Sequence, residues 1–174
     1  MFRVVNVSKI SAENVLAVYT GIMAVLYVLY GFLELANGTT SWLTPSTKLN
    51  LQLGVKVGDL NVPYAMPNPF AGFALLVTGI VFLRGVKGLW YKKPEGWAFT
   101  IVGLFLAGLL AVLSWLISLA HMLNTYYPLA LGGVVEIPWS PLKEEWLLNP
   151  ASTLFPAVLP TFLLYKWRRR FGIK

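Results

Sequence analysis

The sequence predicts an all-α membrane protein, a bundle of four transmembrane helices with a small β-hairpin cap in its external loops. The chain of 174 residues is 57% hydrophobic and only 12% charged, whereas soluble domains are about 25% charged. Residues 97–123 contain no Lys, Arg, Asp or Glu. As a helix they would be about 40 Å long, which exceeds the ~30 Å hydrocarbon core of a bilayer.

The first transmembrane helix is predicted at 12–36. Ser11 is a suitable N-cap, and Glu13 lies where the helix dipole favours a negative charge. Asn37-Gly38 is typical of the end of a helix. The apolar run is about 20 residues long, longer than the ~7–15 residues of a signal peptide, so we expect a span that is not cleaved.

The first external loop, 37–66, carries a strand pattern. Apolar and other residues alternate from Leu49 to Val57, Gly58-Asp59 is suited to a tight turn, and the alternation resumes from Leu60 to Tyr64. This pattern predicts a β-hairpin with one half-buried face. That face would be covered by the helix ends, by the second external loop or by a partner.

The second and third helices are predicted at 67–90 and 97–123. Pro69 suits the first turn of a helix, and the segment 92–96 is a tight turn between the two spans. The strictly apolar part of the second helix is short, so Arg84 and Lys87 should extend their side chains to the lipid headgroups.

The fourth helix is predicted at 150–167, with a kink at Pro156 and Pro160. The second external loop, 124–149, contains prolines and aromatic residues typical of the membrane interface. Within it, 134–137 could add a third strand to the hairpin, and 142–148 could form a short helical turn on the membrane.

The distribution of basic residues predicts the orientation. The net charge is +7, but the basic residues cluster beside the apolar runs, which argues against a nucleic-acid partner. The positive-inside rule places both termini in the cytoplasm of a cell-membrane protein. The expected membrane anchors are Arg84, Lys87, Arg168, Arg169 and Arg170. The C-terminal basic run either serves as a plain anchor or binds anionic lipid.

Composition argues against several chemistries. The absence of cysteine excludes disulfides and thiolate metal sites, and a single histidine cannot supply bis-histidine haem ligation. Ser118 and His121 are three residues apart, but Ser in an apolar helix usually bonds backbone. We therefore expect no metal and no cofactor, and the sequence argues against an enzyme without deciding the question. The absence of Cys and the single Gln are compatible with a thermophilic source.

One set of residues could bind a ligand. Tyr27, Tyr30 and Glu34 share a face of the first helix, and His121 is predicted at a similar height on the third. Ionisable residues at membrane depth are candidates for function. This set could bind a quinone head group or relay protons. Alternatively, Glu34 and His121 are ordinary polar residues near the headgroups.

Small residues on two helices predict close helix packing. They are Gly72, Gly79, Ala107, Ala111, Ser114 and Ser118. They could face another subunit or pack inside the bundle. Asn37-Gly38-Thr39 is also a glycosylation sequon in the predicted external loop.

Two family resemblances accompany these patterns. Four spans with a β-bearing first outer loop resemble the plan of the claudins, although the paired cysteines of the claudin loop are missing. The segment YVLYGFLELANG, 27–38, is similar to the first span of DoxX- and DoxD-type membrane proteins, some of which are linked to quinones. Neither resemblance assigns a site residue here.

The sequence leads to two functional hypotheses. The first is a non-catalytic subunit of a larger membrane assembly, with other membrane subunits or further copies of itself as partners. The second is a quinone- or lipid-binding component of a redox or proton-coupled system that uses the Glu/His/Tyr set. A channel or carrier would need a polar lining that these helices mostly lack.

Overall fold

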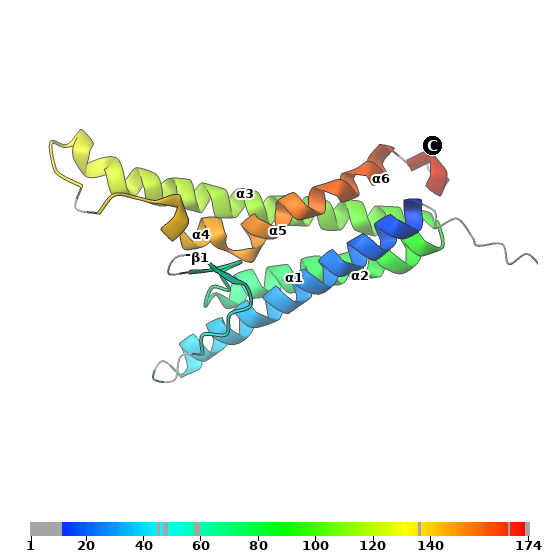
Figure 1. The fold of residues 1–174 in the computed structure, drawn as a ribbon, viewed down its shortest axis with the longest axis horizontal. Helices are drawn as coiled ribbons and strands as arrows, with labels where there is room; N and C mark the ends of the chain where they lie inside the picture. The colour runs from blue at the N-terminus through cyan, green and yellow to red at the C-terminus, as the bar shows by residue number, and fades with distance from the viewer. Residues whose placement is uncertain are drawn as a thin grey trace, which may run out of the picture.

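The computed structural model describes residues 12–44, 46, 49–57, 60–135, 137–166 and 168–172. Three long helices, α1, α2 and α3, are followed by a fourth that is divided into shorter pieces (Figure 1). The long elements are α1 Ala12–Leu43, α2 Pro69–Trp90 and α3 Pro94–Ala130, and the strands are β1 Val55–Val57 and β2 Leu60–Val62. The C-terminal pieces are η1 Pro141–Lys143, α4 Glu145–Leu148, α5 Pro150–Val158, η2 Leu159–Phe162, α6 Leu163–Lys166 and η3 Arg168–Phe171.

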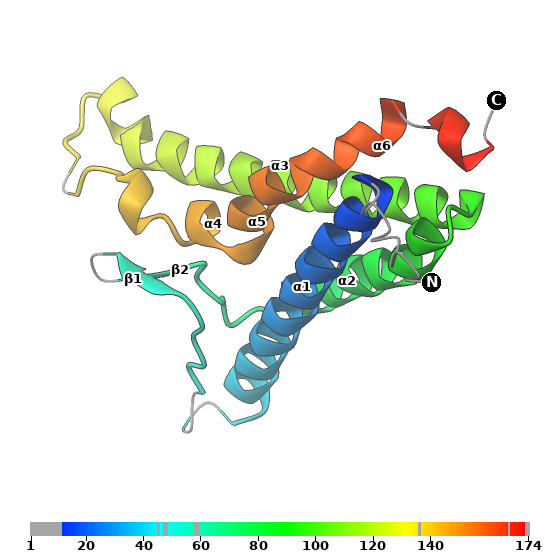
Figure 2. The same ribbon diagram turned by 45° about the vertical axis from the view of Figure 1, so that its right-hand side comes forward.

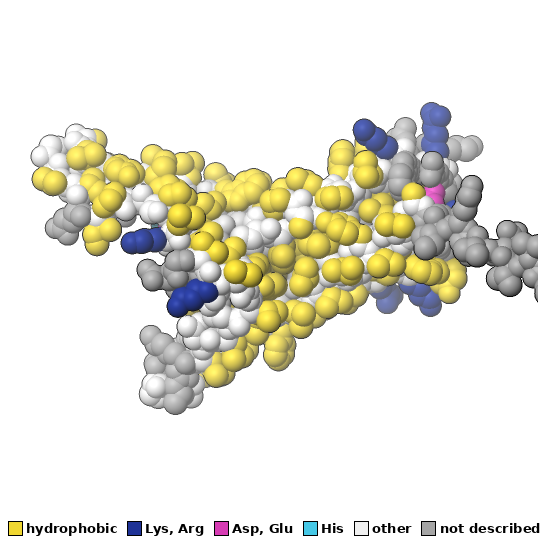
Figure 3. Space-filling view, in the orientation of Figure 1, with side chains coloured by type: hydrophobic (Ala, Val, Ile, Leu, Met, Phe, Trp, Pro, Cys, Tyr) yellow, Lys and Arg dark blue, Asp and Glu magenta, His cyan; other side chains and the backbone are white. Residues whose placement is uncertain are grey.

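Four helical segments are long and apolar enough to cross a membrane, the fourth being 145–166. Hydrophobic side chains cover the middle of the molecule, and basic side chains lie at both ends, with more of them at one end (Figure 3). The start of α1, the α2–α3 turn and η3 all lie at this end, which we call the basic end (Figure 2). The opposite end carries β1 and β2, and we call it the hairpin end. The predicted four-helix membrane fold with a β-hairpin is confirmed.

Glycines bring α1 and α2 into backbone contact. A methyl group on Gly72 would lie 2.4 Å from the Leu35 nitrogen, and one on Gly31 would lie 2.6 Å from the Leu76 nitrogen. Side chains at these positions would hold the helices apart, so glycine is required for this packing. The same device joins α2 to α3, where Gly88 and Gly96 meet backbone to backbone.

The predicted end of the first helix at Asn37-Gly38 is wrong, because α1 continues to Leu43. A methyl group on Gly38 would meet Pro69 at 2.3 Å, so this glycine serves helix contact rather than termination. The added turn is polar, and the hydroxyls of Thr40 and Ser41 donate to carbonyls four residues earlier at 2.8 Å. Such bonds let polar residues continue a helix.

The predicted end of the third helix at 123 is also wrong. α3 runs to Ala130 and contains Pro128 in its last turn. The helix stops after Leu131, where Gly132 adopts a φ of 77°, a left-handed conformation typical of a glycine C-cap. Because the helix takes residues 124–130, the second loop is shorter than predicted. The described part of 134–137 forms no strand, and the sheet has two strands.

The structure contains the predicted β-hairpin, but each of its strands has only 3 residues. β1 and β2 pair antiparallel with Val55 opposite Val62 and Val57 opposite Leu60. The predicted turn, Gly58-Asp59, lies outside the described residues. All three residues of β1 are exposed, so the half-buried face expected for this strand is not observed, whereas Asn61 and Val62 of β2 are half-buried. Beyond β2, Tyr64 donates its backbone N–H to Leu148 at 2.8 Å. Burial, together with the charge of Glu145, raises the pKa of the Tyr64 phenol.

The fourth span changes helix type at its prolines. Between α5 and α6 the chain forms the 3₁₀ segment η2, consistent with the predicted irregularity at Pro156 and Pro160. The Trp97 indole N–H donates to the Leu164 carbonyl at 2.8 Å and ties α6 to α3. The predicted helical turn at 142–148 corresponds to η1 and α4.

Candidate functional site: a buried carboxyl group beside a membrane-facing cavity

Glu34 is the most deeply buried acidic residue among those that the structure describes. It lies on the buried face of α1 and is 1% exposed. Its Oε1 accepts a hydrogen bond from the Met66 backbone N–H at 3.2 Å. Its Oε2 has no hydrogen-bond partner among the described residues. A buried, unpartnered carboxyl oxygen is costly, and such a group calls for a functional or structural explanation.

A cavity of about 230 Å³ lies beside Glu34, where α1, α2, α3 and the α4–α5 region meet. Most of its lining is apolar, and Phe70 and Leu113 in that lining are exposed on the helix surfaces. In a membrane these surfaces face lipid. The cavity therefore has room for a ring or a short chain that enters from the bilayer.

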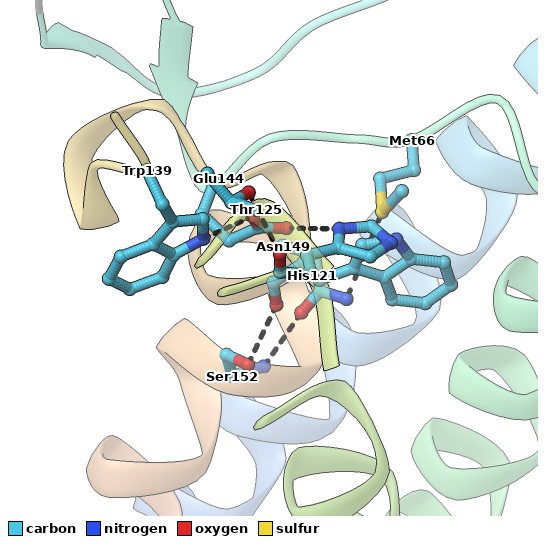
Figure 4. A network of polar contacts seen from close by, with 8 residues as sticks. Met66, His121, Thr125, Trp139, Glu144, Asn149 and Ser152 are labelled. Carbon is cyan, nitrogen blue, oxygen red and sulfur yellow. Dashed lines mark hydrogen bonds and ion pairs between the residues drawn. The ribbon is translucent and has the colours of Figure 1, made fainter. Parts of the chain in front are cut away.

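Two further polar residues line the same cavity. The Asn149 Nδ2 donates to the Ser114 hydroxyl at 3.0 Å, and its Oδ1 accepts from the Ser152 N–H at 2.9 Å. Asn149 therefore both caps α5, as Figure 4 shows for its contact with Ser152, and joins α5 to α3 through Ser114. Asn149 and Ser114, the two residues that line the cavity, are both buried. The sequence reasoning did not select Asn149, although Asn before Pro150 is a recognisable helix-start signal.

Three buried polar atoms without partners share one face of α1. Besides Glu34 Oε2 they are Thr20 Oγ1 and Tyr27 OH. These residues are seven apart, a spacing that places them on one side of a helix. None of the three atoms has a hydrogen-bond partner among the residues that the structure describes. The buried side of α1 thus carries polar groups along much of its length.

The structure does not assemble the predicted four-residue set. Tyr27 packs against Phe82, with ring centroids 5.8 Å apart. The Tyr30 hydroxyl donates to the Leu53 carbonyl and holds the first loop. His121 does not line the Glu34 cavity. Its ring pairs with Glu144 instead.

The His121 contact belongs to a second polar group at the hairpin end (Figure 4). The His121 Nδ1 lies 3.1 Å from Glu144 Oε1, and the Trp139 indole N–H donates to Glu144 Oε2 at 2.8 Å. Glu144 is buried, while the His121 side chain is half exposed. The carboxylate is fully engaged, so this group holds the second loop against α3.

The small residues lie inside the bundle. Gly72 and Gly79 meet α1 at backbone distance. All four predicted residues of α3 are buried: Ala107, Ala111, Ser114 and Ser118. The sequence left open whether these small residues face another subunit or pack inside the bundle, and internal packing accounts for these positions.

The predicted anchors lie at the basic end. Arg84 and Lys87 are exposed on α2, and Arg169 is exposed on η3. The side chains of Arg168 and Arg170 lie outside the described part of the structure. No group of three His, Asp or Glu side chains in the described residues could hold a metal ion.

Comparison with known proteins gives one match. The family described as the MJ0565 integral membrane domain matches residues 10–167, nearly the whole chain. No curated protein and no solved structure matches.

Proposed function

The chain belongs to the MJ0565 integral membrane domain family, and from this premise we propose that it is a non-catalytic subunit of a larger membrane assembly. The basic end would face the cytoplasm, as the positive-inside rule favours. The proposal rests mainly on one observation. The far end of α3 and the loop after it expose large apolar side chains, and we infer that this region lies outside the hydrocarbon core of the bilayer.

The position of this region along the membrane normal, relative to the start of α2, follows from the contacts of α3. Ile117 lines the Glu34 cavity together with Phe70, which belongs to the first turn of α2. Residues 118–130 therefore continue past the start of α2 by about 20 Å of helix. The strictly apolar part of α2, residues 69–83, is about 22 Å long, so the ~30 Å hydrocarbon core extends past the start of α2 by about 8 Å, to about residue 123 of α3. The end of α3 thus lies in the headgroup layer and beyond it.

This projecting part is apolar. Several of its aliphatic side chains are more than half exposed, up to 82% for Val134. They are Leu123, Leu129, Leu131, Val134 and Ile137. Figure 1 shows the end of α3 extending away from the other helices, and hydrophobic side chains continue over it in Figure 3. Apolar surface in such a place favours a protein partner. We propose the extramembrane part of a neighbouring membrane subunit.

Purification of the tagged full chain from its native membrane in a gentle detergent tests this function. We expect companion proteins in fixed stoichiometry, identified by mass determination and peptide sequencing. Leu131→Glu and Val134→Glu should each reduce their recovery by roughly tenfold or more, because a buried apolar contact becomes an unpaired charge.

The matched control is Val55→Glu, an exposed apolar residue at the same end but on the hairpin. The Val55→Glu variant should still be recovered with its companion proteins. Recovery of a lone chain, or equal loss of companions in all three variants, would overturn the proposal that the end of α3 docks a partner.

A second candidate function is favoured by the Glu34 Oε2 at the cavity, which finds no hydrogen-bond partner in the part of the chain that the structure describes. In this proposal the chain binds the head group of a quinone or lipid and serves a redox or proton-coupled system. Asn149 and Ser114 would complete the polar side of the site.

Glu34→Gln tests this candidate because the amide oxygen can still accept the Met66 hydrogen bond. Organic extracts of the purified variant and of wild type are compared by mass spectrometry. We expect a small amphiphile that is retained by wild type and by Glu144→Gln but lost from Glu34→Gln. Identical extracts, with unchanged activity of the native membrane, would exclude the ligand role.

A further inference from the structure

A large groove lies at the basic end, between α2 and the beginning of α3. Its volume is about 790 Å³. Three basic side chains line it, Arg84, Lys87 and Lys93, and one acidic side chain, Glu95. We propose that this groove binds the phosphate head group of one anionic phospholipid. This site is independent of the proposed subunit role.

The charges in the groove are unbalanced. Arg84 and Lys87 are three residues apart and therefore project from the same side of α2. Neither forms an ion pair within the described part of the chain, and the same holds for Lys93. The neighbouring Lys92 lies 3.8 Å from Glu13 on α1 instead. A single acid, Glu95, leaves a net positive groove that a phosphate would neutralise.

The start of α3 adds to this field. The N-cap residue of α3 is Lys93, whose side chain makes no capping hydrogen bond. The first N–H groups of a helix carry a partial positive charge and are a favourable place for phosphate. Both Lys93 and Glu95 line the groove, so this end of the helix borders it. The N-terminus of α3 and the basic side chains of the groove therefore both favour the binding of a phosphate group.

The groove also has an apolar side, which favours a lipid over a free anion. Ile80 and Leu83 lie up to two turns further into the membrane on α2 than Lys87, and Phe99 lies on the facing part of α3. All three are exposed on the lipid-facing surface. An acyl chain could lie along them while the head group meets the cations. Basic pockets between transmembrane helices bind anionic lipids in this way.

Native mass spectrometry of the full chain tests the site. The protein is released from detergent micelles that contain equal amounts of phosphatidylglycerol and phosphatidylcholine. We expect wild type to retain one phosphatidylglycerol in preference to phosphatidylcholine. The double variant Arg84→Gln/Lys87→Gln should bind it roughly tenfold or more weakly, since each basic residue near a membrane surface contributes appreciably to anionic lipid binding.

Arg169→Gln is the matched control, because Arg169 is an exposed basic residue at the same end but outside the groove. It should retain the lipid. If the double variant loses its helical circular dichroism, Lys93→Gln replaces it, since Lys93 is exposed and makes no side-chain cap.

Three outcomes would overturn the inference. One is equal retention of the two lipids by wild type. Another is equal loss of bound phosphatidylglycerol in the groove variant and in Arg169→Gln, which would indicate that the lipid is attracted to the basic end in general and not to the groove. The third is displacement of the lipid by millimolar inorganic phosphate, which would indicate a site for free anions.

Discussion

Asn37 and Leu51 exchange two hydrogen bonds. The Asn37 Nδ2 donates to the Leu51 carbonyl at 2.9 Å, and the Leu51 N–H donates to Asn37 Oδ1 at 2.8 Å. A side chain of α1 thus takes the place of a neighbouring strand. Gln52 repeats the arrangement with the Ala65 backbone, with both distances 2.9 Å. Asn37 thus holds the first loop on α1, and Gln52 joins two parts of that loop; Asn37 is buried with no room for a glycan.

Asn37→Leu should detach the first loop from α1. Two backbone groups of the exposed Leu51 would lose their partner, and each hydrogen bond contributes about 0.5–1.5 kcal/mol. We expect faster hydrogen exchange over 49–53 and a lower unfolding temperature in detergent. Asn124→Leu is the control, because Asn124 is exposed on α3. Unchanged exchange over 49–53 in the Asn37 variant would contradict the proposed role.

Gly72→Ala should weaken the packing of α1 on α2. The added methyl group would lie 2.4 Å from backbone nitrogen, so one helix has to move, at a cost of about 1–3 kcal/mol. Gly21→Ala provides the comparison, since its methyl group would meet only Val86 side-chain atoms at 3.7 Å or more. Alanine favours the helix there, so stability should be equal or slightly higher. Thermal unfolding in detergent distinguishes the two, and equal effects would refute the backbone contact.

Glu144→Ala should release the second loop from α3. The Trp139 indole N–H and the His121 ring would both lose their partner. The expected effect is faster hydrogen exchange over 137–143, with exchange in α2 unchanged. Glu145→Ala serves as the control because Glu145 is exposed. If both variants exchange alike, Glu144 is not the residue that holds the loop.

Trp97→Phe should loosen α6. The variant keeps an aromatic ring but removes the N–H that bonds the Leu164 carbonyl at 2.8 Å, a loss of about 1 kcal/mol. Trp90→Phe is a matched change at an exposed position of α2. Hydrogen exchange over 163–166 should rise in the first variant alone. A similar rise in both would argue against this bond.

The ends of the helices show where local sequence signals fail. Asn37-Gly38 has the composition of a helix end, yet Gly38 packs against Pro69 and the helix continues. The start of α2 does follow its local signal, because Pro69 stands in the first turn as predicted, and the Asn68 side chain accepts from the N–H groups of Phe70 and Ala71. A glycine that permits close packing and one that ends a helix look alike in a sequence. The distant contact decides between them.

By itself, the sequence determined the four membrane spans and the antiparallel hairpin. Both depend on patterns within about 20 neighbouring residues: a run of apolar side chains long enough for the bilayer, or an alternation beside a turn. The tertiary structure alone decided the partners of the polar residues. Glu34 bonds a backbone group 32 positions away, and His121 an acid 23 positions away. A hydrogen bond depends on where two atoms meet in space, and only the packing of the helices and loops brings such distant residues together.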